Sequence, residues 1–319
     1  MHRLRIFLAD LLGVAILTGT FLSAAAGMGA HLGRISLDWD VLAHFAPIWL
    51  AGAALGLVLG LLFRGRLRLF IVGIGLLGVV AGAWLVAPEY LRDTGPKAAA
   101  GGSGELKIVS LNVYVSNPAP EATADWILAQ DPDVVILAEY RPEVRQRILE
   151  RGGWNATCIR CDSTVLTRLP IVATSRAKGD GPLVTATLRD ARGEFTVVGM
   201  HNAWPTDVAD QQRQEERIRR TLRRFPGERT ILAGDFNSAP WSFSRQRWDR
   251  TFGLFRRDRA IFSWPAQPYK QLKWTAVPFL PIDHVYAGSG WATVSIKRGP
   301  RLTSDHYPLI TVLAPLEPR

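Results

Sequence analysis

Three apolar stretches occupy the first 90 residues of this 319-residue chain and constrain its fold more than any other feature. They cover residues 6–30, 41–63 and 67–87. Each is close to the length of about 20 residues that a helix needs to cross the hydrocarbon core of a bilayer. The sequence therefore predicts a membrane anchor of three transmembrane helices over residues 1–93. Alternatively, the first stretch is a cleaved signal peptide, because basic residues precede it, and a two-helix hairpin would remain.

The distribution of basic residues predicts which way this anchor faces. Arg3 and Arg5 precede the first stretch, and Arg64, Arg66 and Arg68 lie between the second and the third. Loops rich in arginine and lysine stay on the cytoplasmic side of a membrane. With three spans, everything after residue 87 lies on the opposite side. We therefore expect a multi-pass protein of the cell (inner) membrane whose C-terminal domain is periplasmic or otherwise extracytoplasmic.

A short segment, residues 94–104, separates the apolar region from the rest of the chain. Its sequence TGPKAAAGGSG is rich in Gly, Ala and Ser, which is typical of a flexible linker. Residues 105–319 then alternate strand-like and helix-like segments, the pattern of an α/β or α+β domain. We expect strands at 106–112, 134–138, 163–167, 183–188, 195–201, 230–233, 282–286 and 309–313, and helices at 121–130, 142–151 and 207–224.

Net charge and the two cysteines each leave several alternatives open. The formal net charge of +10 favours an anionic partner, whether nucleic acid, phospholipid headgroups or a phosphorylated substrate. The arginines of residues 207–224 interleave with Gln and Glu, so this helix presents either a solvated face or an anion-binding one. Cys158 and Cys161 form a lone CxxC. A short-loop disulfide, reduced structural thiols and a redox or metal site are all open for this pair.

Polar side chains stand at the ends of several expected strands. A single such residue is usually a turn or capping residue, but burying several unpaired would be costly. Polar strand ends gathered at one edge of a sheet are how α/β folds build their sites. The segments are IVSLN with Asn112, VVILAE with Glu139, TVVGMH with His201, ILAGDFN with Asp235 and Asn237, PIDHVY with Asp283, and LTSDHYPL with Asp305 and His306.

In this order the segments resemble the endonuclease/exonuclease/phosphatase superfamily, metal-dependent phosphoesterases that include nucleases and neutral sphingomyelinases. GDFN and SDHYPL are the most specific parts, and the resemblance runs from residue 106 to the C-terminal end. It implies an α/β (α+β) fold, a four-layer sandwich of two packed β-sheets flanked by helices. It also implies a phosphoester hydrolase that needs a divalent metal ion, Mg2+ with Mn2+ as the alternative.

The resemblance implies a role for each matched residue. Glu139 is the principal metal ligand, with Asn112 beside it and Asp305 as a second metal-side carboxylate. Such oxygen donors suit Mg2+. The catalytic residues are His306 as general base, Asp283 as its orienting partner, Asp235 as the group that orients or deprotonates the attacking water, Asn237 as the amide on a phosphate oxygen, and His201 as donor to the phosphate or leaving oxygen. Whether Asp235 or His306 takes the proton is open.

The sequence thus predicts a membrane-anchored phosphoesterase that hydrolyses phosphodiester bonds outside the cytoplasm. Nucleic acid would bind a basic surface, which makes a nuclease the first expectation. A sphingomyelinase-like or other lipid or small-molecule phosphoesterase is the alternative, because the anchor holds the domain near lipid phosphate. A non-catalytic binding module on the same fold is a remote alternative, since the main positions all survive.

Three further residues lie beside these motifs. Trp204 follows His201 and Trp241 follows Asn237, and each either lines the pocket or packs in the core. His284 stands where an aromatic residue is common in the superfamily. Since neighbouring residues of a strand face opposite sides, His284 is expected to point away from the site.

Overall fold

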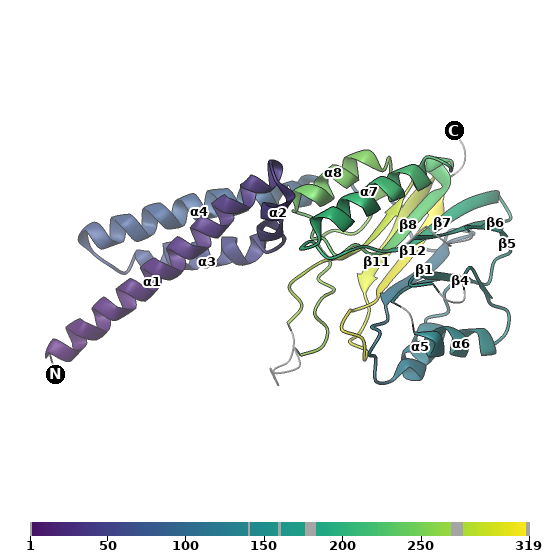
Figure 1. Cartoon of the computed structure of the whole chain (residues 1–319), viewed down its shortest axis with the longest axis horizontal. Helices are drawn as coiled ribbons and strands as arrows, with labels where there is room; N and C mark the ends of the chain where they lie inside the picture. The colour runs from purple at the N-terminus through teal and green to yellow at the C-terminus, as the bar shows by residue number, and fades with distance from the viewer. Residues whose placement is uncertain (1, 140, 159–160, 176–182, 269–276, 317–319) are drawn as a thin grey trace. The chain divides into compact units, whose positions relative to one another are not determined.

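The computed structural model describes residues 2–139, 141–158, 161–175, 183–268 and 277–316 (Figure 1). The chain divides into two compact units. The first contains Met1–Arg92 together with Ala239–Gln246, and the second contains Asp93–Ser238 and Arg247–Arg319.

Apolar helices form most of the first unit: α1 (His2–Ala30), α2 (Leu37–His44), α3 (Ala46–Gly60) and α4 (Gly65–Leu91). Helices α1 and α4 are long and apolar enough to cross a membrane, while α2 and α3 reach that standard only together and are bent by 60°. The unit therefore holds two candidate spans, or three if the bent pair counts as one. The predicted second span is interrupted because Pro47 begins a new helix.

Small residues allow the apolar helices to pack closely. A side-chain carbon placed on Gly78 of α4 would lie 2.7 Å from Cβ of Ala53 on α3 and 2.9 Å from Cα of Ala24 on α1. Backbones approach in this way when small residues line helix interfaces in a membrane.

Segment Ala239–Gln246 joins the first unit through two buried side chains. The Asp40 carboxylate accepts hydrogen bonds from the backbone nitrogens of Phe243 and Ser244, at 2.7 and 2.9 Å. These amides open helix α8 (Phe243–Thr251), so Asp40 satisfies donors that a helix N-terminus leaves unpaired. Trp241 Nε1 donates to the His44 carbonyl oxygen at 2.8 Å. Trp241 is therefore a packing residue, which is the second of its two sequence interpretations.

Two six-stranded sheets form the centre of the second unit. In spatial order, the first sheet contains β11 (Trp291–Arg298), β12 (Leu309–Pro315), β1 (Leu106–Asn112), β2 (Val134–Ala138), β4 (Thr164–Thr167) and β3 (Asn155–Ala156). The second contains β5 (Ile171–Thr174), β6 (Leu183–Asp190), β7 (Gly193–His201), β8 (Thr230–Asp235), β10 (Asp283–Ala287) and β9 (Phe255–Arg256).

Helices cover the outer faces of the two sheets, which gives four layers (Figure 1). Helices α5 (Pro120–Ala129) and α6 (Pro142–Glu150) pack Ile127 and Ile148 against the first sheet. Helices α7 (Val208–Leu222) and α8 pack Ile218 and Trp248 against the second. A mainly aliphatic core, which includes Val197 together with Phe195 and Trp291, fills the space between the sheets. The predicted four-layer sandwich is confirmed.

The first residues of the segment predicted as a linker are attached to the second unit. The Arg257 guanidinium donates to the carbonyl oxygens of Thr94 and Pro96, at 3.4 and 3.1 Å. Lys97 also forms a β-bridge with Thr293 of strand β11. This part of the segment is therefore held at the sheet edge by backbone groups, which its Gly, Ala and Ser content did not indicate.

Candidate active site

Strand pairing brings the predicted polar residues to one region of each sheet. Strands β7 and β8 are parallel and place His201 beside Asp235, while antiparallel β10 places Asp283 on the other side of Asp235. In the first sheet, parallel β1 and β2 place Asn112 beside Ala138, the residue before Glu139. Parallel strands carry their C-terminal ends at one edge, which is where open α/β sheets bind ligands.

The buried carboxylate of Asp235 is the centre of the site. Its Oδ2 accepts a hydrogen bond from Asn112 Nδ2 at 3.0 Å. The same oxygen lies 3.7 Å from His201 Nε2 and 3.6 Å from His306 Nε2. The other oxygen, Oδ1, accepts from the backbone nitrogen of Asn237 at 2.8 Å. Groups from both sheets therefore converge on one carboxylate.

Each histidine is oriented by a carboxylate on its other ring nitrogen. His306 Nδ1 donates to Asp283 at 2.8 Å, and His201 Nδ1 donates to Asp162 at 2.7 Å. Burial opposes the charge on His306, but the carboxylates of Asp283 and Asp235 raise its pKa to about 10. Burial likewise opposes the charge on His201, but the hydrogen bond to Asp162 and the charge of Asp235 raise its pKa to about 9. The neighbouring carboxylates therefore favour the charged form of both rings.

Glu139 and Asp305 carry the carboxylates predicted to hold a metal ion, and Asn112 turns its amide nitrogen toward Glu139. Glu139 Oε1 accepts from Asn112 Nδ2 at 3.0 Å, and Oε2 accepts from the Val115 nitrogen at 2.5 Å. Burial raises the pKa of Asp305, and the Glu139 carboxylate adds to this although His306 opposes it. Among the described residues, Asp305 Oδ1 is buried with no hydrogen-bond partner. Two carboxylates that repel each other beside an unsatisfied oxygen fit a divalent cation of the Mg2+ type.

Asp235, Asp283 and His306 form another group of candidate donors, with ligand atoms within 4.8 Å of one another. His306 Nδ1 is already committed to Asp283, however. The hydrogen bond and the raised pKa of His306 favour an acid–base pair at this place. Asp283 is therefore the hydrogen-bond partner of His306 in this structure.

Backbone strain coincides with two of the predicted residues. The backbone φ angles of Glu139 and Asn237 are +60° and +48°. Both lie in the left-handed region, which residues other than glycine rarely adopt. Such conformations persist where the surrounding structure imposes them, and they concentrate at functional sites. Asn237 Nδ2 also donates to the Asn202 carbonyl oxygen at 2.9 Å, which leaves its second N–H for another acceptor.

The turn after residue 302 is held by a serine that carried no predicted role. Ser304 Oγ donates to the Asn112 carbonyl oxygen at 2.6 Å and accepts from the His306 nitrogen at 3.0 Å. These bonds tie the SDH turn to the end of strand β1. The motif itself was the only sequence signal for this role.

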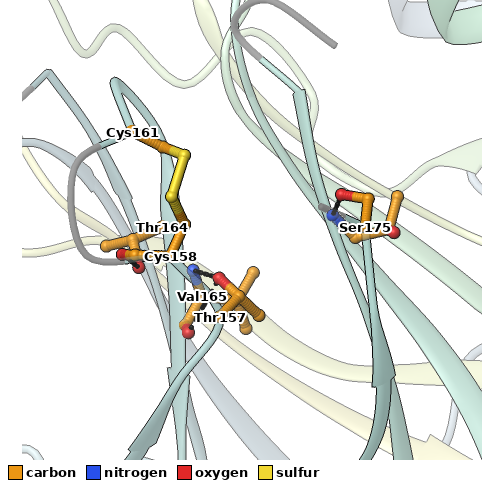
Figure 2. The surroundings of a disulfide bond; sticks show 7 residues. Thr157, Cys158, Cys161, Thr164, Val165 and Ser175 are labelled. Carbon is orange, nitrogen blue, oxygen red and sulfur yellow. Dashed lines mark hydrogen bonds between the residues drawn. A yellow bond between two sulfur atoms is a disulfide. The ribbon is translucent and has the colours of Figure 1, made fainter. Parts of the chain in front are cut away.

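Asp162, the partner of His201, was missed by the sequence analysis because it ends no predicted strand. It directly follows Cys161, which is joined to Cys158 by a disulfide (Figure 2). Thr164 Oγ1 donates to the Cys158 carbonyl oxygen at 3.2 Å, which attaches the disulfide segment to strand β4. Of the three alternatives for the cysteines, the structure shows the disulfide. Its position next to Asp162 is the signal that could have identified this residue.

Opening the Cys158–Cys161 disulfide should weaken the orientation of His201. We expect Cys158→Ser/Cys161→Ser to lower kcat by roughly tenfold, because Asp162 gains freedom and His201 loses its fixed tautomer. Asp162→Ala should lower kcat at least as much. Removing the disulfide from the Asp162→Ala protein should then lower kcat only slightly further. Steady-state rates of the four proteins test this. Independent, multiplying losses would contradict the coupling.

Two packed sheets flanked by helices are the fold of solved endonuclease/exonuclease/phosphatase proteins. The chain belongs to the Endonuclease/Exonuclease/phosphatase family, which it matches over residues 109–306. No curated protein matches the sequence.

Solved structures of this family share the fold at low sequence identity. An endonuclease/exonuclease/phosphatase from Bacteroides vulgatus is similar with a TM-score of 0.55 and 14% identity, over 67% of this chain and 100% of that one. Danio rerio TDP2 complexed with a single-strand DNA product is similar with a TM-score of 0.52 and 15% identity, over 66% and 100%. A family protein from Leptotrichia buccalis has a TM-score of 0.51 and 16% identity, over 66% and 99%.

Proposed function

We propose that this protein is a membrane-anchored, divalent-metal-dependent phosphodiesterase that cleaves nucleic acid outside the cytoplasm. The observation that carries the proposal is the convergence on Asp235 Oδ2 of Asn112 Nδ2, His201 Nε2 and His306 Nε2, at 3.0, 3.7 and 3.6 Å. Hydrolysis of a phosphodiester needs an activated water, a proton for the leaving oxygen and neutralisation of the phosphoryl charge. Residues for all three needs lie around this oxygen.

The residues of the chain divide the chemical work. Asp235 and His306 face each other across 3.6 Å and act as one unit in accepting the proton of the attacking water, so the proton is assigned to the pair. Asp283 keeps the His306 ring oriented. The protonated Nε2 of His201 donates to the leaving oxygen. The free N–H of Asn237 holds a non-bridging phosphate oxygen.

A divalent cation would be held by Glu139, Asn112 and Asp305. Bound there, it would neutralise charge on the phosphoryl oxygens. Asn112 now donates its amide to two carboxylates and accepts from the Tyr114 nitrogen through Oδ1. Offering that oxygen to a cation requires the amide to turn over, which replaces two carboxylate contacts with a metal contact.

Charge and an exposed tryptophan favour nucleic acid as the substrate. The chain carries a net charge of +10, and phosphate backbones bind basic surfaces. Trp204 lies three residues after His201 and is 62% exposed. An exposed indole this close in sequence to His201 offers a stacking face to a base. The solved TDP2 complex with single-strand DNA product also makes single-stranded DNA a sensible first substrate.

The substrate assay compares four compounds with and without EDTA: single-stranded DNA, RNA, sphingomyelin and a chromogenic phosphodiester. We expect metal-dependent cleavage of DNA or RNA by the full chain in detergent. Trp204→Ala should raise the KM for nucleic acid by roughly tenfold, because stacking contributes about 1–3 kcal/mol per base. It should leave the rate with the small chromogenic diester unchanged. Cleavage of sphingomyelin alone would show that the substrate is a lipid and not nucleic acid. Cleavage of none of the four compounds would refute the proposed phosphodiesterase activity.

The extracytoplasmic location rests on the number of spans. If α2 and α3 form one bent span, the anchor crosses three times and the arginines around residue 66 stay inside. The Cys158–Cys161 disulfide supports the oxidising side of the membrane. A C-terminal alkaline phosphatase fusion should therefore be active. Activity only from a cytoplasmic reporter would reverse the location.

A further inference from the structure

A second buried histidine lies directly beside the site, on the opposite face of strand β10 from Asp283. His284 is fully buried, and its Nδ1 lies 2.7 Å from Asp258 Oδ2. Its Nε2 lies 2.9 Å from the carbonyl oxygen of Ser238. Asp283 and His284 are neighbours on strand β10. Asp283 holds His306 on one face of the strand, and His284 holds Ser238 on the other.

Hydrogen bonds to two acceptors hold the His284 ring in place. One acceptor is a carboxylate oxygen and the other is a backbone carbonyl oxygen. The Asp258 carboxylate also accepts from the Val285 nitrogen and from the Arg256 guanidinium, at 2.9 and 3.4 Å. Burial alone would raise the pKa of Asp258, but His284 and Arg256 hold it well below its usual range. His284 therefore bridges the Asp258 carboxylate and the Ser238 carbonyl group.

The carbonyl group that His284 holds belongs to the loop that presents Asn237. Asn237 has φ of +48°, so its backbone stays in a costly conformation only while neighbouring groups keep it there. The backbone nitrogen of Asn237 donates to Asp235, and its side chain donates to the Asn202 carbonyl oxygen. Both contacts hold the loop on the N-terminal side of Ser238. The His284 contact restrains the loop from the other side. The Asp258 carboxylate, 2.7 Å from the other ring nitrogen, holds the ring in place for this contact.

We infer that His284 is a positioning residue that fixes the Asn237 loop through the Ser238 carbonyl group, with Asp258 as the hydrogen-bond partner that orients its ring. This role rests on the proposed function, because it acts through the Asn237 amide on the phosphate. It explains why the chain has a histidine where an aromatic ring would pack equally well. The ring still packs on Phe236 at 5.6 Å between centroids, but it adds two donors that a phenyl ring lacks.

A double-mutant cycle between positions 284 and 237 tests the inference. His284→Phe keeps an aromatic ring and removes both donors, and we expect kcat to fall roughly tenfold because a small displacement of a positioned group is costly. Asn237→Ala should lower kcat by about 100-fold. If His284 acts through Asn237, the double variant should have the rate of Asn237→Ala alone. His284→Gln keeps one donor for the Ser238 carbonyl and should recover part of the rate.

Tyr286→Phe is the matched control on the same strand. Its hydroxyl donates at 2.5 Å to Asp249, which also accepts from Arg256, so the hydroxyl belongs to the same buried network. The substitution keeps the ring, which packs on Phe236 at 5.3 Å between centroids. We expect a lower melting temperature with an unchanged kcat. Equal losses from His284→Phe in both backgrounds, or a folded His284→Phe with the wild-type rate, would overturn the inference. A wild-type rate for Asn237→Ala would instead refute the proposed role of Asn237.

Discussion

Replacing His306 with alanine is expected to lower kcat on the order of 1000-fold, the range of general acid–base catalysis. The buried ring connects Asp283 at 2.8 Å to the central Asp235 at 3.6 Å, so no neighbouring group can take over its position. Binding of substrate should change little, because the metal-side residues and Trp204 remain. The expected pattern is therefore a fall in kcat with a nearly constant KM.

His31→Ala serves as the control for the His306 variant. It makes the same chemical change in the helical first unit, where His31 contacts the Ala81 carbonyl oxygen at 3.0 Å. Circular dichroism and thermal melting of both variants establish that they fold. A folded His306→Ala protein with the wild-type rate would remove this residue from the mechanism.

Glu139→Gln is expected to abolish activity by removing the principal cation ligand. The change keeps the shape of the side chain and removes the negative charge that an Mg2+ ion requires. In the wild type, saturating Mg2+ should raise the melting temperature, since a ligand at 100 times its Kd stabilises the folded state by about 2.7 kcal/mol. The variant should show neither the activity nor the Mg2+-dependent rise, while its melting temperature in EDTA stays within a few degrees of the wild type.

Glu121→Gln is the matched control for the metal experiment. Glu121 lies exposed in the first turn of α5, and its replacement makes the same change of charge away from the site. It should retain both the activity and the Mg2+-dependent rise in melting temperature. A Glu139→Gln protein that still responds to Mg2+ would show that the ion binds elsewhere, with the Asp235 and Asp283 carboxylates as the next candidates.

The core strands were predictable because each is a short apolar run between polar segments. Strands β1 and β2 begin and end at the residues expected, and both are almost wholly buried between layers. Strand β11 was missed because only Trp291 and Ala292 at its start are buried, so its sequence lacks that pattern. Its place in the sheet comes from pairing with β12. The interruption between α2 and α3 was missed because apolar composition continues through it.

The site residues were predictable to the extent that each carried a motif. The proposed roles of Asn112, Asp235 and His306 came from strand ends and from the GDFN and SDHYPL segments. Asp162 carried no motif, because its partnership with His201 depends on a loop from the other sheet. His284 was predicted to point away from the site, and it contacts Asp258 and Ser238 instead of the catalytic cluster. Its hold on the Asn237 loop could not be read from strand alternation.

The sequence by itself determined the apolar character of the N-terminal helices, most strands of the two sheets, and the chemical identity of the polar strand ends, because these follow from local composition and from motifs. Only the tertiary structure decided which groups meet. Asn112, His201 and His306 are far from Asp235 or on other strands and loops, yet all three reach its Oδ2 oxygen. Asp162 in turn reaches His201 from the other sheet. Distances of about 3 Å between such residues depend on long-range packing, which no local pattern encodes.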